Sequence, residues 1–311
     1  MGKSSNNNQI KIVTINARTL SSRLKQEEIL HEIEINKQQI TLIQESRIPG
    51  FGIESRGQYT LIHSGQKVHK HNGVAIILSP DVQLIDADTE NSNDRLLAVK
   101  VIVKGLRLQL ISGYAPTNEA KDSAKDTFYR QLQKIVNLCD KEYKLILGAD
   151  MNATIAQSSF GFWRCLGKNN YDRATNDNVM RLLKFADENH PILENTKRLS
   201  KRIHTNTWSK NSSTGIFEKR IDYFAIPKFI RNFCVGCRVY RGKSASYDTD
   251  HKMIQMTLQV PKNRRHFLAA IGGGRRKAAE PKLDLKVLKE PEINKKYCDL
   301  LDSEMGKEGR N

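Results

Sequence analysis

Short apolar runs recur along the first 260 residues of the chain, and polar stretches separate them. Eight of these runs have the length and β-branched content of strands, at residues 10–15, 40–44, 73–78, 96–103, 108–115, 143–147, 220–226 and 253–260. Three segments, at 24–33, 128–139 and 179–186, show the spacing of amphipathic helices instead. Strands outnumber helices and several adjoin as hairpins. The pattern therefore predicts an α/β fold, a mixed two-sheet β-sandwich flanked by helices, rather than a doubly wound parallel sheet.

The composition changes at both ends of this patterned region. Residues 1–9 are polar and lack the apolar core of a signal peptide, so we expect a disordered N-terminus followed by one domain over residues 10–260. Residues 261–311 have the composition of a basic linker or tail with one short helix, at 283–301. No stretch approaches the roughly 18–20 apolar residues of a membrane helix. We expect no membrane partner and a nuclear or cytoplasmic chain that is not secreted.

Five scattered cysteines, an odd number, are not a secreted disulfide framework, so reduced thiols are expected. Cys234 and Cys237 form a Cys-x-x-Cys pair, which can hold zinc. No second pair lies nearby, and positions three apart in a strand point to opposite faces. The sequence therefore favours ordinary thiols over a zinc site.

The charge of the chain changes the range of plausible partners. It carries 51 Lys and Arg against 34 Asp and Glu, a net charge of +17, of which residues 1–260 hold +12. A positive field of this size concentrates polyanions, which favours nucleic acid or phosphoinositide membranes over neutral metabolites. The densest basic run, at 262–277, is typical of a flexible linker, a phosphate contact or a nuclear import signal.

Polar residues cluster at the ends of the predicted strands. Taken singly, such a residue is usually a turn or a cap. Together they offer four acids, two amides, a phenol and an imidazole, which suits a hard metal ion and phosphoryl chemistry. These candidates are Asn16, Glu45, Tyr114, Asp150, Asn152, Asp222, Asp250 and His251.

The order of these motifs resembles that of a known family. The motifs are Asn16 after the first strand, Gln44-Glu45 after the second, Tyr114-Ala-Pro-Thr117, Gly148-Ala-Asp150-Met-Asn152, Ile221-Asp222-Tyr223 and Asp250-His251. From about residue 10 to 260 the chain resembles the endonuclease/exonuclease/phosphatase superfamily, in the branch of apurinic-endonuclease-like nucleases of non-LTR (LINE-type) retrotransposons. The segments 16–20 and 283–301 are similar to that branch in particular. The resemblance implies the family's four-layer fold.

The sequence departs from the family in two places. Thr249 stands where many relatives have serine before the Asp-His pair. Lys219 stands where vertebrate repair enzymes have an aromatic residue, which weakens the case for abasic-site specificity.

The resemblance also implies roles for the candidates. Glu45, held by Asn16, would ligate Mg²⁺, with Mn²⁺ as a possible substitute. Asp150 would orient or deprotonate the attacking water, and Asn152 would place the water or a phosphate oxygen. Gln44 would be structural.

The remaining candidates would act around the phosphate. His251, paired with Asp250, would face the non-bridging phosphate oxygens. Tyr114 would hydrogen-bond the phosphate, and Asp222 would support the metal or the histidine. Either Asp150 or His251 could be the proton acceptor.

Three functions are compatible with these residues. The first is a Mg²⁺-dependent DNA endonuclease, expected to be a monomer, that leaves a 3′-hydroxyl and works with DNA and with a reverse transcriptase in trans. The second is a phosphatase or phosphodiesterase of the same fold acting on RNA or inositol phosphates. The third is a catalytically idle, domesticated module that binds chromatin. The basic charge and the retrotransposon-like segments favour the first.

Overall fold

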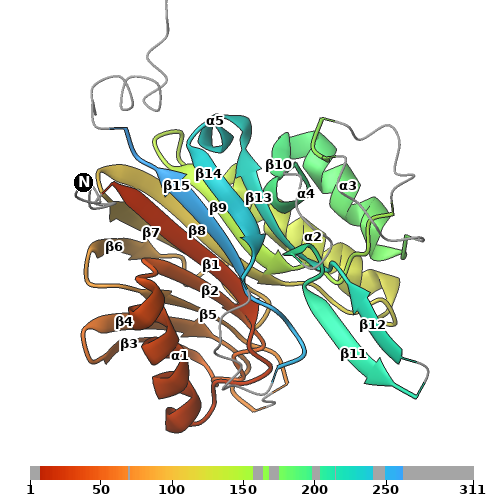
Figure 1. The fold of residues 1–311 in the computed structure, drawn as a ribbon, viewed down its shortest axis with the longest axis horizontal. Helices are drawn as coiled ribbons and strands as arrows, with labels where there is room; N and C mark the ends of the chain where they lie inside the picture. The colour runs from red at the N-terminus through yellow and green to blue at the C-terminus, as the bar shows by residue number, and fades with distance from the viewer. Residues whose placement is uncertain are drawn as a thin grey trace, which may run out of the picture. The chain divides into compact units, whose positions relative to one another are not determined.

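The computed structural model describes residues 8–68, 71–156, 164–167, 175–197, 204–213, 215–240 and 249–261, which belong to one compact unit (Figure 1). Nearly all of the predicted tail and of the predicted disordered N-terminus lies outside these residues, so both assignments stay predictions. The first strand, β1 (Gln9–Asn16), begins at the last residue of that N-terminal segment.

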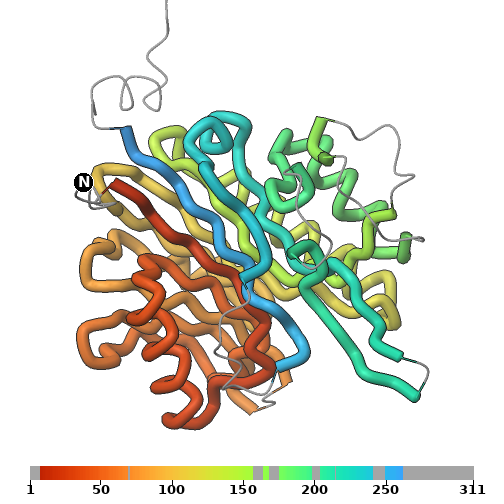
Figure 2. Tube along the Cα trace, in the orientation of Figure 1, coloured from red at the N-terminus to blue at the C-terminus, as the bar shows by residue number. Residues whose placement is uncertain are grey.

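Seven strands of the described chain form one mixed sheet in the order β14, β15, β1, β2, β5, β4, β3. Strands β1 and β2 (Ile40–Gln44) are parallel, whereas β1 and β15 (Ile254–Gln259) are antiparallel. Strands β1 and β15 come from opposite ends of the described chain and lie side by side (Figure 2). The other members are β3 (Phe51–Arg56), β4 (Tyr59–Ser64), β5 (Val74–Leu78) and β14 (Cys234–Val239).

A second sheet has, within the described residues, six strands in the order β10, β13, β9, β8, β7, β6. Here β8 (Leu106–Tyr114) and β9 (Lys144–Asp150) are parallel, and β13 (Asp222–Pro227) runs antiparallel to β9. The remaining strands are β6 (Val82–Ala87), β7 (Leu96–Val103) and β10 (Pro191–Leu193). A separate hairpin, β11 (Trp208–Ser212) and β12 (Gly215–Lys219), projects from the sandwich (Figure 1).

The two sheets pack face to face because their strands are apolar on both sides. Ile12 and Leu42 belong to the cluster between the sheets, together with Phe224 of the second sheet. Their sequence neighbours Val13 and Ile43 point the other way and pack against a helix. Strands that are covered on both faces have apolar residues at consecutive positions. The sequence shows this pattern.

Helices cover the outer faces of both sheets. Helix α1 (Arg23–Asn36) packs on the seven-stranded sheet, while α2 (Asp122–Asn137) and α3 (Asn178–Asn189) share a core cluster with the six-stranded sheet. Two four-residue helices, α4 (Glu194–Lys197) and α5 (Lys228–Arg231), lie next to β10 and β13 in the chain. The predicted four-layer α/β sandwich is confirmed. None of the described helices is long and apolar enough to cross a membrane.

All eight predicted strands and all three predicted helices are present, with ends shifted by a few residues. The pattern did not predict several short or edge strands. β3, for example, is an edge strand whose residues are alternately exposed and half-buried, so it lacks an apolar run.

The prediction that Cys234 and Cys237 point to opposite faces is wrong. A register shift between Cys234 and Gly236 marks a β-bulge, which adds one residue to β14. Both thiols are therefore buried in the cluster between the sheets, where they act as core side chains.

The two parallel strand pairs position the functional residues. Asn16 ends β1 opposite Gln44 at the end of β2, and Tyr114 ends β8 opposite Asp150 at the end of β9. Gln44 Nε2 donates to Ser112 Oγ at 3.1 Å, which joins the two sheets near this end. Four carboxyl-terminal strand ends thus meet at one edge of the sandwich.

Candidate active site

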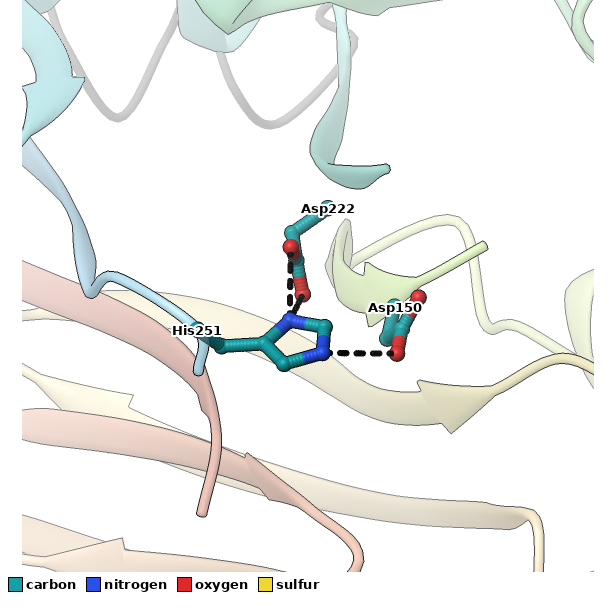
Figure 3. A group of neighbouring side chains, drawn as sticks. All are labelled: Asp150, Asp222 and His251. Carbon is teal, nitrogen blue, oxygen red and sulfur yellow. Dashed lines mark hydrogen bonds and ion pairs between the residues drawn. The ribbon is translucent and has the colours of Figure 1, made fainter. Parts of the chain in front are cut away.

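Three buried ionisable residues meet at this edge, as Figure 3 shows. Asp150 is the last residue of β9 and lies directly opposite Asp222, the first residue of β13. His251 lies in the segment that leads into β15. Asp150 and Asp222 are each 1% exposed and His251 is 9% exposed.

The imidazole of His251 lies between the two carboxylates. Its Nδ1 is 3.0 and 3.2 Å from the two oxygens of Asp222, and its Nε2 is 3.9 Å from Asp150 Oδ2 (Figure 3). Burial opposes a charge on the ring, but the negative charge of Asp222 and its hydrogen bond outweigh this and raise the pKa of His251. His251 is therefore held as a charged donor at neutral pH.

The sequence-based pairing of His251 with Asp250 is wrong, because the partner of His251 is Asp222. Neighbouring side chains in an extended segment point in opposite directions. Asp250 Oδ2 accepts a hydrogen bond from Trp208 Nε1 at 2.9 Å, and its other oxygen lies 3.7 Å from Arg18 Nε. Asp250 contributes only the last of several effects on the pKa of His251.

Asp150 is held in an electrostatically costly position. Burial and then the neighbouring Asp222 raise the pKa of its carboxyl, against the lowering effects of His251 and Asn16. Asn152 N donates to Asp150 Oδ1 at 2.9 Å, and Asn152 itself has a left-handed φ of 47°. A buried carboxyl with a raised pKa is a suitable general base for chemistry near neutral pH.

Asn16 joins Asp150 to a further carboxylate. Its Nδ2 donates to Glu45 Oε1 at 2.8 Å and to Asp150 Oδ2 at 3.0 Å, and its Oδ1 accepts from Arg18 N. Glu45 follows β2 directly and has a φ of 50°, so the chain turns sharply where its side chain enters the site. One fully buried amide thus fixes the spacing of two carboxylates from different sheets.

Tyr114 lies beside these carboxylates at the end of β8. Burial and then the charges of Glu45 and Asp150 raise the pKa of its hydroxyl, which therefore stays protonated and can donate a hydrogen bond. Arg95 holds the residue in place, since its guanidinium lies 5.1 Å from the centre of the ring and donates to Tyr114 O at 3.2 Å.

Buried hydroxyl and amide groups support the site. Gln44 has the structural position expected of it, since its Nε2 donates to Thr14 Oγ1, Ser112 Oγ and Gly148 O. Thr249 Oγ1 donates to Asn16 O at 2.8 Å and accepts from His251 N. Threonine in place of the family's serine keeps the hydroxyl that joins β1 to the His251 segment.

The residues at this edge fit a divalent cation. Asp150, Asp222 and His251 have potential ligand atoms within 4.8 Å of one another and form the one such group in the described part of the chain. The charged imidazole donates hydrogen bonds, so the oxygens for an ion come from the carboxylates and from Glu45, which Asn16 joins to Asp150. Carboxylate and amide oxygens are the ligands that hard cations prefer. Burial first and the charge of Asp222 second raise the pKa of Asp150, and a dication bound beside these carboxylates would oppose the effect of Asp222.

Four residues around the site carried no recognisable sequence signal. Arg95 holds Tyr114, Trp208 binds Asp250, and Arg47 NH2 donates to Glu45 Oε2 at 3.1 Å. Arg18 lies within the retrotransposon-like segment, and no role could be assigned to it from the motif alone. Single arginines have no diagnostic spacing, so only the three-dimensional arrangement finds them.

No family model matches the chain. Craniofacial development protein 2 of Bos taurus is 27% identical over 233 residues, which are 72% of this chain and 38% of that protein. The chain thus spans about two-fifths of the length of the curated relatives it matches.

Solved structures match a larger share of the chain than these relatives do. The endonuclease domain of TRAS1, a telomere-specific non-LTR retrotransposon, matches 81% of this chain and 100% of its own, with a TM-score of 0.61 and 16% identity. An AP endonuclease from Archaeoglobus fulgidus has the same coverage, a TM-score of 0.58 and 20% identity. With its two mixed sheets and flanking helices, the chain has the fold of the endonuclease/exonuclease/phosphatase superfamily.

Proposed function

We propose that the chain is a divalent-metal-dependent endonuclease that nicks DNA and leaves a 3′-hydroxyl and a 5′-phosphate. The observation that carries the proposal is the position of His251 between Asp222 and Asp150, with Asn16 joining Asp150 to Glu45. Hydrolysis of a phosphodiester requires a charged donor, a base and ligands for a hard metal ion close to one another. These residues provide all three at one edge of the sandwich.

Each residue has a distinct part in this reaction. Asp150 orients or deprotonates the attacking water, and Asn152 helps to place it. His251, kept charged by Asp222, donates to a non-bridging phosphate oxygen, and Tyr114 donates to the phosphate as well.

Glu45 and Asn16 would hold Mg²⁺, or Mn²⁺ in its place. The bound ion would polarise the phosphodiester and stabilise the negative charge of the leaving 3′ oxygen. Because Asn16 also contacts Asp150, the amide sets the distance between the metal ligand and the base.

Two further features favour DNA as the substrate. The chain has a net charge of +17, which attracts polyanions. The β11–β12 hairpin starts beside the site, where Trp208 pairs with His251, and carries the exposed side chains of Ile216 and Phe217. A two-stranded ribbon fits a DNA groove, and apolar side chains can wedge between bases. We also propose that the protein is a monomer, that it works with a reverse transcriptase in trans, and that it is nuclear or cytoplasmic.

The test is incubation of the purified protein with supercoiled plasmid in Mg²⁺ or in EDTA. We expect nicked circles in Mg²⁺ only, with ends that a polymerase extends without prior phosphatase treatment. Asp150→Asn should abolish nicking, whereas Asp86→Asn, a change at an exposed carboxylate, should not. Cleavage that persists in EDTA, or in Asp150→Asn at the wild-type rate, contradicts the proposal. Hydrolysis of RNA or inositol phosphates without plasmid nicking would favour the second function.

A further inference from the structure

Arg47 is an ion-pair partner of Glu45 that the proposed reaction does not use. Its NH2 group is 3.1 Å from Glu45 Oε2, while the other oxygen of Glu45 accepts from Asn16. The side chain of Glu45 is 16% exposed and that of Arg47 is 38% exposed. Both oxygens of the proposed metal ligand are therefore occupied by protein donors.

The backbone fixes Arg47 close to Glu45. Both residues have a left-handed φ, 50° for Glu45 and 54° for Arg47. Arg47 N also donates to Asn72 O at 3.0 Å, which anchors the turn to the segment just before β5. The backbone therefore keeps Arg47 beside Glu45, while its partly exposed side chain is long enough to reorient toward a phosphate at the site.

The guanidinium is not fully satisfied in this arrangement. Its Nε is buried and has no hydrogen-bond partner among the described residues. A buried donor without an acceptor is costly, and a guanidinium has five N–H groups that match the oxygens of a phosphate. A second orientation of Arg47, with a phosphate as acceptor, would satisfy more of them.

We infer that Arg47 is the counter-ion of Glu45 in the metal-free protein and turns to a DNA phosphate when a divalent cation takes its place. The inference rests on the proposed function. A guanidinium beside Glu45 repels a dication, so it weakens metal binding in the absence of DNA. A phosphate that attracts the guanidinium away removes this repulsion. Metal and DNA then increase each other's affinity, because a coupling free energy between two ligands is reciprocal.

The experiment measures binding of Mn²⁺ to the full chain without DNA, by the electron paramagnetic resonance signal of free Mn²⁺. Arg47→Met removes the charge at similar length and should bind Mn²⁺ about two- to fivefold more tightly, the factor that a partly exposed ion pair contributes. Arg47→Lys keeps the charge and should stay near wild type. Arg23→Met, at an exposed arginine of α1, is the matched control and should change nothing.

A second measurement follows duplex DNA binding in Mn²⁺, with wild type and every variant also carrying Asp150→Asn so that the DNA is not cut. Arg47→Met should weaken it severalfold and reduce the slope of log affinity against log salt by about one, as expected for one lost phosphate contact. Thermal unfolding of each variant checks that the fold is retained. Unchanged or weaker Mn²⁺ binding by folded Arg47→Met overturns the inference, and so does unchanged DNA binding.

The variant Glu45→Gln separates this inference from the proposed function. If it loses Mn²⁺ binding while Arg47→Met behaves as wild type, only the role of Arg47 is wrong. If Glu45→Gln binds Mn²⁺ as wild type does, the proposed metal site is wrong and the inference is overturned with it.

Discussion

The carboxylate of Asp222 lies 3.0 Å from His251 Nδ1, although 29 residues separate the two along the chain. The same carboxylate lies opposite Asp150 in the β9–β13 register. Asp222 therefore acts on both neighbours, because it raises the pKa of His251 and also that of Asp150. Asp222 thus keeps the imidazole charged and, after burial, contributes most to raising the pKa of the Asp150 carboxyl.

Asp222→Asn should lower the activity. It should also lower the alkaline limit, which is the pH above which activity is lost. Without the negative charge, burial dominates and the pKa of His251 falls. The proposed reaction needs the protonated ring, so activity should be lost at a lower pH than in wild type. We expect kcat/KM for plasmid nicking to fall by about 10²–10⁴-fold at neutral pH. A pH profile of kcat/KM from 6 to 10 measures both effects.

Asp250→Asn is the matched comparison for that change. Its carboxylate binds Trp208 and lies near Arg18, so its loss should shift the alkaline limit less than Asp222→Asn does. An equal shift in both variants would show that Asp250 contributes as much as Asp222 to the charge of His251.

Asn16→Ala should move the acidic limit of activity to higher pH. The amide of Asn16 stabilises the ionised form of Asp150 and so lowers the pKa of that carboxyl. Without this hydrogen bond the pKa rises further, and the base becomes ionised only at higher pH. The acidic limb of the kcat/KM profile tests this. Asn16→Ala should also weaken Mn²⁺ binding, because Glu45 loses its anchor.

The layers of the fold could be predicted from the sequence, because strands covered on both faces are apolar throughout. Ile12 and Val13, adjacent in β1, are both fully buried, one between the sheets and the other under α1. Such continuous runs and the helical spacing of α2 and α3 are local signals. The polar ends of the strands were local signals as well, so candidate site residues could be named from the sequence.

The contacts within the site could not be predicted in the same way. The resemblance left open whether Asp222 supports the metal or the histidine. That its carboxylate binds His251 depends on where the segment before β15 meets the start of β13, which is a long-range property. The β-bulge that turns Cys234 and Cys237 to one face likewise depends on pairing with β15. Arg47 carries no motif, and its role depends entirely on the turn that brings it to Glu45.

Gly148→Ala should destabilise the fold, because the glycine of the Gly-x-Asp-x-Asn motif is required by packing. A Cβ at this position would lie 2.6 Å from Leu42 Cδ1 and 3.0 Å from Thr14 Cβ, on the facing sheet. Overpacking of this kind costs about 1–3 kcal/mol in the free energy of unfolding. Denaturant titration measures the loss.

Gly236→Ala provides the control for Gly148→Ala. Nothing lies within 4 Å of a Cβ at Gly236, which also lies in a strand. We expect its free energy of unfolding to stay within about 0.5 kcal/mol of wild type. Equal losses in both variants would mean that the closeness of the sheets at Gly148 is not what requires glycine.

Phe217→Ala should weaken DNA binding without affecting the catalytic residues. Phe217 is 53% exposed on β12 and the adjacent Ile216 is 71% exposed, so neither side chain stabilises the core. An exposed aromatic ring on a ribbon beside the site is positioned to contact bound DNA, and stacking on a base contributes about 1–3 kcal/mol. We therefore expect an unchanged melting temperature, a KM for DNA that is raised about fivefold or more, and a nearly unchanged kcat. Val235→Ala, at a half-exposed side chain of β14 on a different element, should leave the KM at the wild-type value. A Phe217→Ala variant with wild-type KM would mean that the hairpin does not contact the DNA.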